Sequence, residues 1–336
     1  MSGLKIGNSK LKYGLFLAPL AGVSDYAFRQ VSKMCGAEYT VSEMVSAKAL
    51  CYEMRIRKQD KSLARTAPLA FVDKQSLPHA VQIFGCESKF MAEAARLIEG
   101  CAYFGCDSEC PPTAIDINMG CPVNKVVSNG EGSALMKSPS LVGEIVYNVV
   151  RAVNIPVTVK IRAGWDSNSK NAIEIAKIAE ESGAAAVFVH GRTKDQMYMG
   201  HVDYDIIAKV KQNVSVPVIG NGDIYSASDA IKMLDYTKCD GIMVARGALG
   251  NPWIFSEIIA NLENELFIPP NRKQREIIIK AQIDMMINQK GEKIAASEAK
   301  KHLSWYTKGY EGAANLRAKI NNAQTIDEMT KLLWGR

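Results

Sequence analysis

The chain has 336 residues, of which 47% are hydrophobic and 23% are charged, and its formal net charge is +6. This composition is typical of a globular protein and excludes a low-complexity disordered chain. No stretch approaches the roughly 20 apolar residues of a membrane-spanning helix. The first residues also lack the apolar run of a signal peptide. We therefore expect a cytoplasmic protein that has no membrane partner.

The eight cysteines lack the paired spacing of a disulfide framework, which favours a reducing compartment. Four of them, Cys101, Cys106, Cys110 and Cys121, form a loose cluster in the sequence. Their spacing differs from the C-x-x-C pattern of structural zinc sites. We expect mostly buried thiols and no metal.

Eight short apolar or β-branched runs end in Gly, Pro, Asn or Asp, as strands commonly do. They are Leu15–Ala18, Glu38–Val41, Ala80–Phe84, Ala114–Ile117, Val157–Ile161, Ala185–Val189, Pro217–Ile219 and Gly241–Ala245. Helix-like stretches separate most of them, including Lys89–Ile98, Leu141–Val153, Asn171–Ser182 and Ala227–Leu234. Strands that alternate with helices in this way predict an α/β fold with a parallel sheet closed into a (β/α)8 TIM barrel. A doubly wound open sheet is the structural alternative.

The sequence changes character after Phe255, where the barrel would end. No convincing strand follows, and apolar residues on one side predict a helix from Arg275 to Gln289. Between Asn271 and Lys319, eleven Lys or Arg residues stand against five Asp or Glu residues. We therefore expect a barrel domain at residues 1–255 and a small all-helical C-terminal domain at residues 256–336.

Polar residues and glycines collect directly after the predicted strands. The strand ends carry Pro19–Gly22, Glu43-Met44, Gln82–Gly85, Asn118–Pro122, Lys160–Arg162, His190–Arg192, Asn221–Asp223 and Ala245–Ala248. A β/α barrel holds its reactive groups on the loops that follow the carboxyl ends of its strands. The pattern therefore predicts one shared site.

The last two of these loops predict a cofactor that carries a phosphate. Gly222, Gly247 and Gly250 allow the backbone to approach a ligand closely, and the seventh and eighth loops of barrels commonly hold a phosphate. Backbone N–H groups would face the anion, and Arg246 would add positive charge.

Lys160 and His190 each allow two interpretations. Lys160 ends an apolar strand, so its ammonium would either stabilise an anionic reduced flavin in the barrel mouth or pair with Asp116 or Glu43. His190 would be either a buried core residue or a ligand contact.

Cys121 stands between Gly120 and Pro122, which predicts a tight turn rather than a helix. A thiol with a pKa near 8.5 is mostly protonated at neutral pH, so it can donate a proton and recover it. Once deprotonated it could act as a nucleophile. No activating His-Asp pair is evident in the sequence, which favours a proton donor over a nucleophile.

Several of these segments resemble the tRNA-dihydrouridine synthase family, from about Leu4 to Leu333. The matching motifs are APLAGVSD at Ala18–Asp25, DINMGCP at Asp116–Pro122, KIRAGWD at Lys160–Asp166, HGRT at His190–Thr193 and GNGDI at Gly220–Ile224. The tail motif KHLSWYTKG at Lys301–Gly309 is similar to that of the B-type bacterial branch.

The resemblance implies an FMN flavoprotein that reduces particular uridines in tRNA to 5,6-dihydrouridine, with NADPH as electron donor and no obligate protein partner. Hydride would pass from flavin N5 to uracil C6 while Cys121 gives a proton to C5. The target base would have to swing out of the RNA stack into the barrel mouth. The basic helical domain would then bind the tRNA backbone.

The resemblance also implies which residues bind each ligand. The FMN contacts would be Pro19, Leu20, Ala21, Gln82, Lys160, His190, Asn221, Gly222, Asp223, Ala245 and Arg246. Asn118 and Arg162 would contact the uracil. Lys300, Lys301, His302, Lys308 and Arg317 would contact the tRNA backbone.

Two departures from the family pattern leave every reacting group in place. The segment Cys101–Pro112 is longer than the usual connection, and Leu20 stands where methionine is common.

Two other functions remain open. An FMN barrel oxidoreductase similar to dihydroorotate dehydrogenases would leave the basic tail unexplained, whereas a catalytically silent tRNA-binding protein would not need Cys121 or Lys160.

Overall fold

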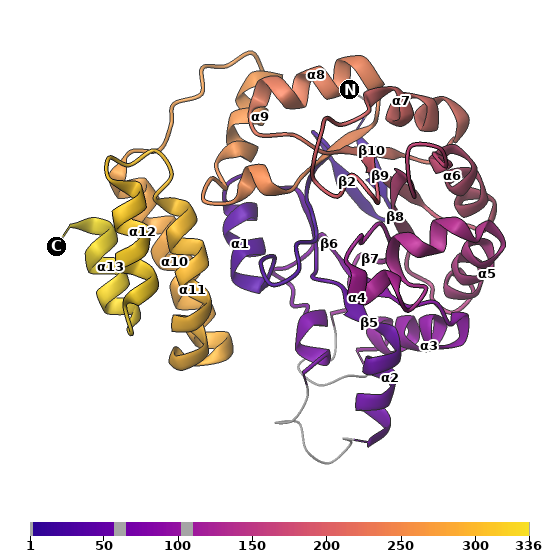
Figure 1. Cartoon of the computed structure of the whole chain (residues 1–336), viewed down its shortest axis with the longest axis horizontal. Coiled ribbons are helices and arrows are strands. Elements are labelled where there is room, and N and C mark those ends of the chain that lie inside the picture. The colour runs from indigo at the N-terminus through magenta and orange to yellow at the C-terminus, as the bar shows by residue number, and fades with distance from the viewer. Residues whose placement is uncertain (1–2, 57–64, 102–109, 336) are drawn as a thin grey trace.

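The computed structural model describes residues 3–56, 65–101 and 110–335 (Figure 1). Eight parallel strands close into a barrel, in which β11 pairs with β3 and β4 pairs with β6. They are β3 (Leu15–Leu17), β4 (Tyr39–Val41), β6 (His79–Phe84), β7 (Ala114–Met119), β8 (Val157–Gly164), β9 (Ala186–Thr193), β10 (Val218–Asn221) and β11 (Gly241–Val244). A short strand, β5 (Val45–Ser46), continues the position of β4 beside β6. The predicted TIM barrel is confirmed, and the open sheet is excluded.

Helices surround the barrel, as Figure 1 shows. They are α1 (Tyr26–Met34), α2 (Ala47–Ile56), α3 (Ser88–Glu99), α5 (Pro139–Val150), α6 (Ala172–Glu181), α7 (Tyr204–Asn213), α8 (Ala227–Thr237) and α9 (Ile254–Leu262). Shorter helical turns are α4 (Asn124–Val127), η2 (Ala67–Ala70), η3 (Gly132–Lys137) and η4 (Arg246–Ala248).

The side chains of the barrel strands alternate between two environments. In β8, Val159 and Ile161 belong to the core between sheet and helices. Thr158 and Lys160 fall on the opposite face, because successive residues of a strand point to opposite sides. This alternation directs one polar series into the barrel interior, toward the carboxyl ends of the strands.

An N-terminal hairpin, not expected from the sequence, covers the other end of the barrel. Its strands β1 (Leu4–Ile6) and β2 (Ser9–Leu11) are antiparallel. Leu4, Ile6 and Leu11 are buried in the same cluster as Phe16 of the barrel interior. The hairpin therefore completes the core at the amino-terminal end of the strands.

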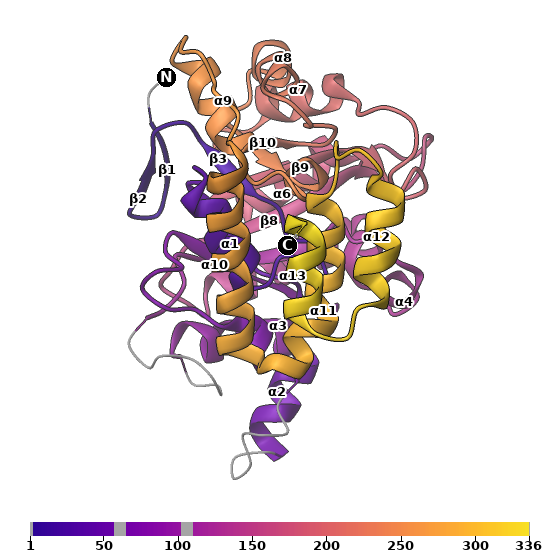
Figure 2. The same ribbon diagram turned by 90° about the vertical axis from the view of Figure 1, so that its left-hand side faces the viewer.

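Four C-terminal helices form a second lobe, whose hydrophobic cluster also includes Ala27, Cys35 and Trp253 from the barrel side. They are α10 (Arg272–Lys290), which contains the expected helix, α11 (Glu292–Tyr306), α12 (Ala313–Asn322) and α13 (Ile326–Trp334). Figures 1 and 2 both place this helical lobe beside α1. Phe255 lies within α9 and belongs to the barrel core. We propose the segment 263–271, between α9 and α10, as the domain boundary.

Two lysines of the helical lobe reach the first loop of the barrel. Lys290 Nζ lies 2.6 Å from Asp25 Oδ2, and Asp25 also caps the N-terminus of α1. Lys301 Nζ donates a hydrogen bond to the carbonyl oxygen of Gly22. The lobe is thus joined to the barrel by polar contacts at the loop that follows β3. None of the helices in the described ranges is long and apolar enough to cross a membrane.

Candidate active site

A cavity of about 340 Å³ opens at the carboxyl ends of the barrel strands. Its lining includes Pro19, Leu20, Ala21, Gln82, Lys160, His190, Asn221, Gly222, Asp223, Ala245 and Arg246, so the structure brings together every residue expected to contact FMN. Asn118, Cys121 and Arg162 line the same cavity. The loops that follow the strands therefore line one shared cavity, as the sequence predicts.

The turn that carries Cys121 is held by hydrogen bonds on both sides. Asn118 Oδ1 accepts from the backbone N–H groups of Gly120 at 3.1 Å and Cys121 at 2.9 Å. The Cys121 carbonyl accepts from the backbone N–H of Ser133 at 3.0 Å and from its hydroxyl at 2.9 Å. Burial raises the pKa of the Cys121 thiol. The thiol is therefore protonated at neutral pH, which suits an acid better than a nucleophile.

Lys160 is a half-buried cation that lines the cavity. Its Nζ donates to Asn221 Oδ1 at 3.1 Å. Burial, followed by the nearby charge of Arg162, lowers the pKa of Lys160 to about 8. In the described part of the chain, neither Asp116 nor Glu43 forms the ion pair that the sequence had left open. The ammonium therefore keeps a charge that a bound anion could offset.

His190 is buried beside this lysine. Burial, together with Lys160 and three arginines, lowers its pKa well below the usual 6.5. The ring is therefore neutral at physiological pH, so it offers a ligand one donor and one acceptor nitrogen.

The rim of the cavity carries an arginine cluster around Asp223. Arg192 binds both carboxylate oxygens of Asp223, at 2.8 and 2.6 Å. Arg246 lies 3.4 Å from the same carboxylate, and its guanidinium stacks over the rings of Tyr198 at 4.8 Å and Tyr225 at 5.7 Å. Sequence reasoning did not propose either tyrosine or Arg192 as a site residue. Tyr198 and Arg246 lie on different loops, and no sequence pattern indicates that their side chains stack.

Two glycines at the cavity leave no room for a side chain. Gly222 has φ +123, and a Cβ there would lie 2.4 Å from Val202 Cγ2. At Gly247 a Cβ would lie 2.0 Å from the carbonyl oxygen of Ile224. The seventh and eighth loops therefore need glycine to bring their backbones together at the cavity wall.

Arg162 links two loops. It is buried, and its Nε donates to the carbonyl of Gly120 at 2.7 Å. One Nη donates to the carbonyls of Thr193 at 2.8 Å and Met197 at 2.9 Å. Arg162 thus supports the Cys121 turn as well as lining the cavity.

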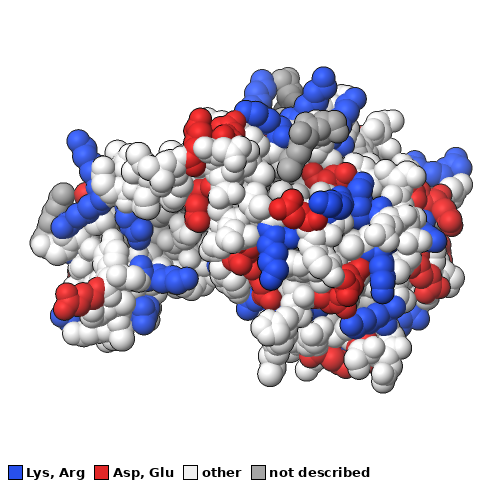
Figure 3. Space-filling model, turned by 90° about the horizontal axis from the view of Figure 1, so that it is seen from above, with Lys and Arg blue, Asp and Glu red and all other residues white. Residues whose placement is uncertain are grey.

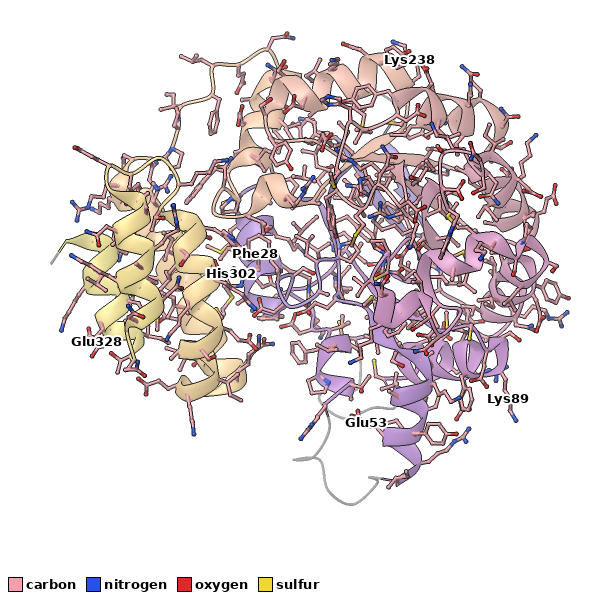
Figure 4. The ribbon with its side chains drawn as sticks, viewed as in Figure 1. Phe28, Glu53, Lys89, Lys238, His302 and Glu328 are labelled. Atoms are coloured by element: carbon pink, nitrogen blue, oxygen red, sulfur yellow. The ribbon has the colours of Figure 1, made fainter. Side chains whose placement is uncertain are left out.

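His302, expected at the tRNA surface, is instead buried. It is 3% exposed, and its ring lies 5.4 Å from that of Phe28 on α1 and 5.3 Å from that of Trp305. Figure 4 shows Phe28 and His302 facing each other between barrel and lobe. Burial lowers the pKa of His302 to about 4, so the ring is neutral. The expectation that His302 contacts tRNA phosphates is corrected: it stabilises the contact between the two lobes.

The four other expected tRNA contacts differ in exposure. Lys308 and Arg317 are exposed. Lys300 and Lys301 are half-buried, and each donates to a backbone carbonyl, that of Asn321 and that of Gly22 respectively. Figure 3 shows basic side chains spread over the visible face of the helical lobe at the left, with a few acidic ones at its lower edge, whereas basic and acidic side chains are interspersed over the barrel.

The cysteine cluster is only partly described. Cys106 and most of the long segment Cys101–Pro112 lie outside the described residues. Among the residues that are described, no three His, Cys, Asp or Glu side chains gather as metal ligands would.

The family model for dihydrouridine synthase (Dus) matches residues 16–333 of the chain. The chain belongs to the dihydrouridine synthase family. A curated relative described as a probable tRNA-dihydrouridine synthase, from Rickettsia conorii, is 41% identical over 95% of this chain and 91% of its own length. The tRNA-dihydrouridine synthase B of Pseudomonas aeruginosa is 39% identical over 97% of this chain and 93% of its own.

Solved structures show the same barrel at much lower sequence identity. Histamine dehydrogenase from Rhizobium sp. 4-9 is 12% identical, with a TM-score of 0.55, over 84% of this dihydrouridine synthase family member. The 6-hydroxypseudooxynicotine amine oxidase of Pseudomonas geniculata N1 is 15% identical, with a TM-score of 0.55, over 78%. The chain spans about half the length of these two proteins, 50% and 49%. They support the fold alone.

Proposed function

We propose that the protein is a cytoplasmic, FMN-dependent tRNA-dihydrouridine synthase that uses NADPH to reduce particular uridines in tRNA. The names of its relatives support this reaction and substrate. The observation that carries the proposal is that Cys121, on a turn fixed by Asn118, lines the same cavity as Lys160 and Arg246.

The donors of the cavity suit a flavin mononucleotide. Lys160 and neutral His190 would hold the polar edge of the ring system, because a cation there stabilises the anionic reduced form. Arg246 and the backbone around Gly222 and Gly247 would hold the phosphate. When bound, the reduced flavin supplies the hydride.

Cys121 provides the proton in this proposal. Its half-buried thiol stays protonated at neutral pH and would deliver its proton to uracil C5. Asn118 and Arg162 would both contact the uracil, and both also hold the Cys121 turn. Asn118 and Arg162 would therefore orient both the Cys121 thiol and the uracil that receives its proton.

The helical lobe would bind the tRNA backbone while the target uridine enters the cavity. A base inside stacked RNA cannot reach a barrel mouth, so the uridine would be flipped out. Lys308 and Arg317, which are exposed on the lobe, would contact phosphates. Lys300 and Lys301 could do so only alongside their contacts within the protein.

The test is to purify the protein and supply FMN, NADPH and tRNA that lacks dihydrouridine. We expect a yellow protein with the absorbance of oxidised flavin, and dihydrouridine detected in the tRNA by mass spectrometry. A protein that takes up no flavin would refute the proposal. A flavoprotein that reduces a small pyrimidine but no tRNA would support the alternative with a small-molecule substrate.

A further inference from the structure

Three buried side chains form a hydrogen-bonded chain that ends at Cys121. Asp116 Oδ2 accepts from Gln82 Nε2 at 2.7 Å, and Gln82 Oε1 accepts from Asn118 Nδ2 at 2.8 Å. Asn118 Oδ1 then accepts from the backbone N–H of Cys121 at 2.9 Å. Gln82 and Asp116 are directly paired in register on β6 and β7, so the sheet itself brings them together.

The direction of this chain is determined at both ends. An ionised carboxylate can only accept, so Asp116 requires Gln82 to turn its NH₂ group toward it. The Gln82 oxygen then faces Asn118, which must present its own NH₂ group. At the far end the backbone N–H of Cys121 can only donate, so it requires the Asn118 oxygen. Every donor meets an acceptor only when both amides have this orientation.

Asp116 itself is firmly held. It is fully buried, and its Oδ1 accepts from the hydroxyl of Thr158 on β8 at 2.6 Å. Burial raises the pKa of Asp116 to about 6, partly offset by the hydrogen bonds of Thr158 and Gln82 and by the charge of Lys160. The carboxylate is therefore ionised at pH 8.

We propose that Asp116 is a positioning residue, which orients the amides of Gln82 and Asn118 so that Asn118 anchors the turn of the proton donor Cys121. The proposal rests on the function given above, because it assigns Asp116 a role in delivering that proton. Asp116 does not line the cavity, so it acts only through the residues that do. Without the carboxylate, only the backbone N–H groups of Gly120 and Cys121 would orient the Asn118 amide, and Gln82 would be free to turn, so the anchor of the Cys121 turn would be weaker.

Three variants separate this role from general damage to the barrel. Asp116→Ala removes the acceptor. Asp116→Asn can still offer an amide oxygen to Gln82 and an amide N–H to Thr158, so it should rescue the chain. Thr158→Val, a matched control of similar shape, removes the other hydrogen bond of Asp116 and leaves the Gln82 contact in place.

The first readout is alkylation of Cys121 in the flavin-free protein at pH 8, followed by mass spectrometry of its peptide. We expect Asp116→Ala to alter the rate by up to about tenfold, the effect of one hydrogen bond. Asp116→Asn and Thr158→Val should stay near the wild-type rate, and the peptide of Cys86 should be unaffected in all three. Melting temperatures should show whether each variant is folded.

The second readout measures kcat, the KM for tRNA and the rate of flavin reduction separately in the holoenzyme. We expect Asp116→Ala to lower kcat for tRNA on the order of 10²-fold, because a small misplacement of a reacting group has an effect of that size. The KM for tRNA and the rate of flavin reduction by NADPH should change much less than kcat, although Asn118 and Gln82 are the proposed uracil and FMN contacts.

Each outcome decides a different question. Equal effects of Asp116→Ala and Asp116→Asn would mean that an amide oxygen facing Gln82 is not sufficient to hold the turn, and would overturn the proposal. An effect of Thr158→Val as large as that of Asp116→Ala would also overturn it. If wild-type protein formed no dihydrouridine, the proposed function would fail, whereas the alkylation experiment would still test the hydrogen-bonded chain.

Discussion

Lys160 on β8 donates a hydrogen bond to Asn221 on β10 at 3.1 Å, across the intervening strand β9. Asn221 in turn donates from Nδ2 to the carbonyl of Met243 on β11 at 2.7 Å. The half-buried ammonium is thus held by a neutral amide rather than by a carboxylate. Such an arrangement destabilises the charged lysine in the flavin-free protein and prepares it for an anionic ligand.

Replacing this lysine should therefore stabilise the flavin-free protein and weaken flavin binding. Because the folded-state pKa of Lys160 is lowered from 10.5 to about 8, its charge destabilises the folded state below that value. At pH 7 we expect the unfolding free energy of Lys160→Met to exceed that of wild type by up to about 3 kcal/mol. The difference should shrink as the pH rises from 8 to 10.5. Denaturant titration measures stability, and flavin fluorescence measures affinity.

The matched control for that experiment is Lys89→Met, on the outer surface of α3 (Figure 4). It should change neither the stability nor the flavin affinity. Unaltered flavin binding by Lys160→Met would contradict the role of Lys160 in the site.

Replacing Cys121 by Ala should separate flavin chemistry from proton delivery. We expect the rate of dihydrouridine formation to fall by about 10²–10⁴-fold, which is the usual contribution of a general acid. Flavin content and flavin reduction by NADPH should not change, since neither requires the thiol. Cys86→Ala, at another half-buried cysteine, serves as control. Normal turnover by Cys121→Ala would show that another group donates the proton.

The contact between barrel and lobe can be tested at Gly250. Gly250 and Gly312 both have φ +67, but a Cβ at Gly250 would lie 2.3 Å from the carbonyl oxygen of Trp305, whereas nothing lies within 4 Å at Gly312. Alanine at either position should cost about 1–2 kcal/mol of backbone strain. The unfolding free energy of Gly250→Ala should fall by roughly 1–3 kcal/mol more than that of Gly312→Ala, because α11 must move to make room for the methyl group. Equal losses in denaturant titrations would show that the contact tolerates a side chain.

Binding of tRNA should depend on the exposed cations of the lobe. We expect Lys308→Glu and Arg317→Glu each to weaken tRNA affinity and to reduce the slope of log affinity against log salt by about 1. Lys89→Glu makes the same change in net charge as Lys308→Glu, far from the lobe, and should have little effect. Filter binding at several salt concentrations measures all three. The same loss in Lys89→Glu would mean that net charge alone matters.

Much of the barrel and of its site follows from local sequence patterns. Each predicted strand is a short apolar run, and a parallel barrel necessarily gathers the residues after those runs at one end. Lys160 and Cys121 were found in this way. The signal for the N-terminal hairpin was present as well, since Leu4 and Ile6 alternate with polar residues before Gly7-Asn8. Strands of three residues are too short for that pattern to stand out.

What the sequence could not predict depends on contacts between distant segments. The burial of His302 results from its packing against Phe28, far away in the chain. The pairing of Asp116 with Gln82 depends on strand register, which a one-residue shift would destroy. The stacking of Arg246 on Tyr198 likewise needs two loops whose paths only the folded barrel defines.

The contacts of Lys290 with Asp25 and of Lys301 with Gly22 limit how freely the two lobes can be exchanged between relatives. Both lysines belong to the C-terminal helices, yet both bind the loop whose residues Pro19–Ala21 line the cavity. A chimera that joins this barrel to a foreign helical lobe would therefore lose both contacts at the loop that lines the cavity. Exchanging the lobe between relatives would require moving the first loop of the barrel together with it.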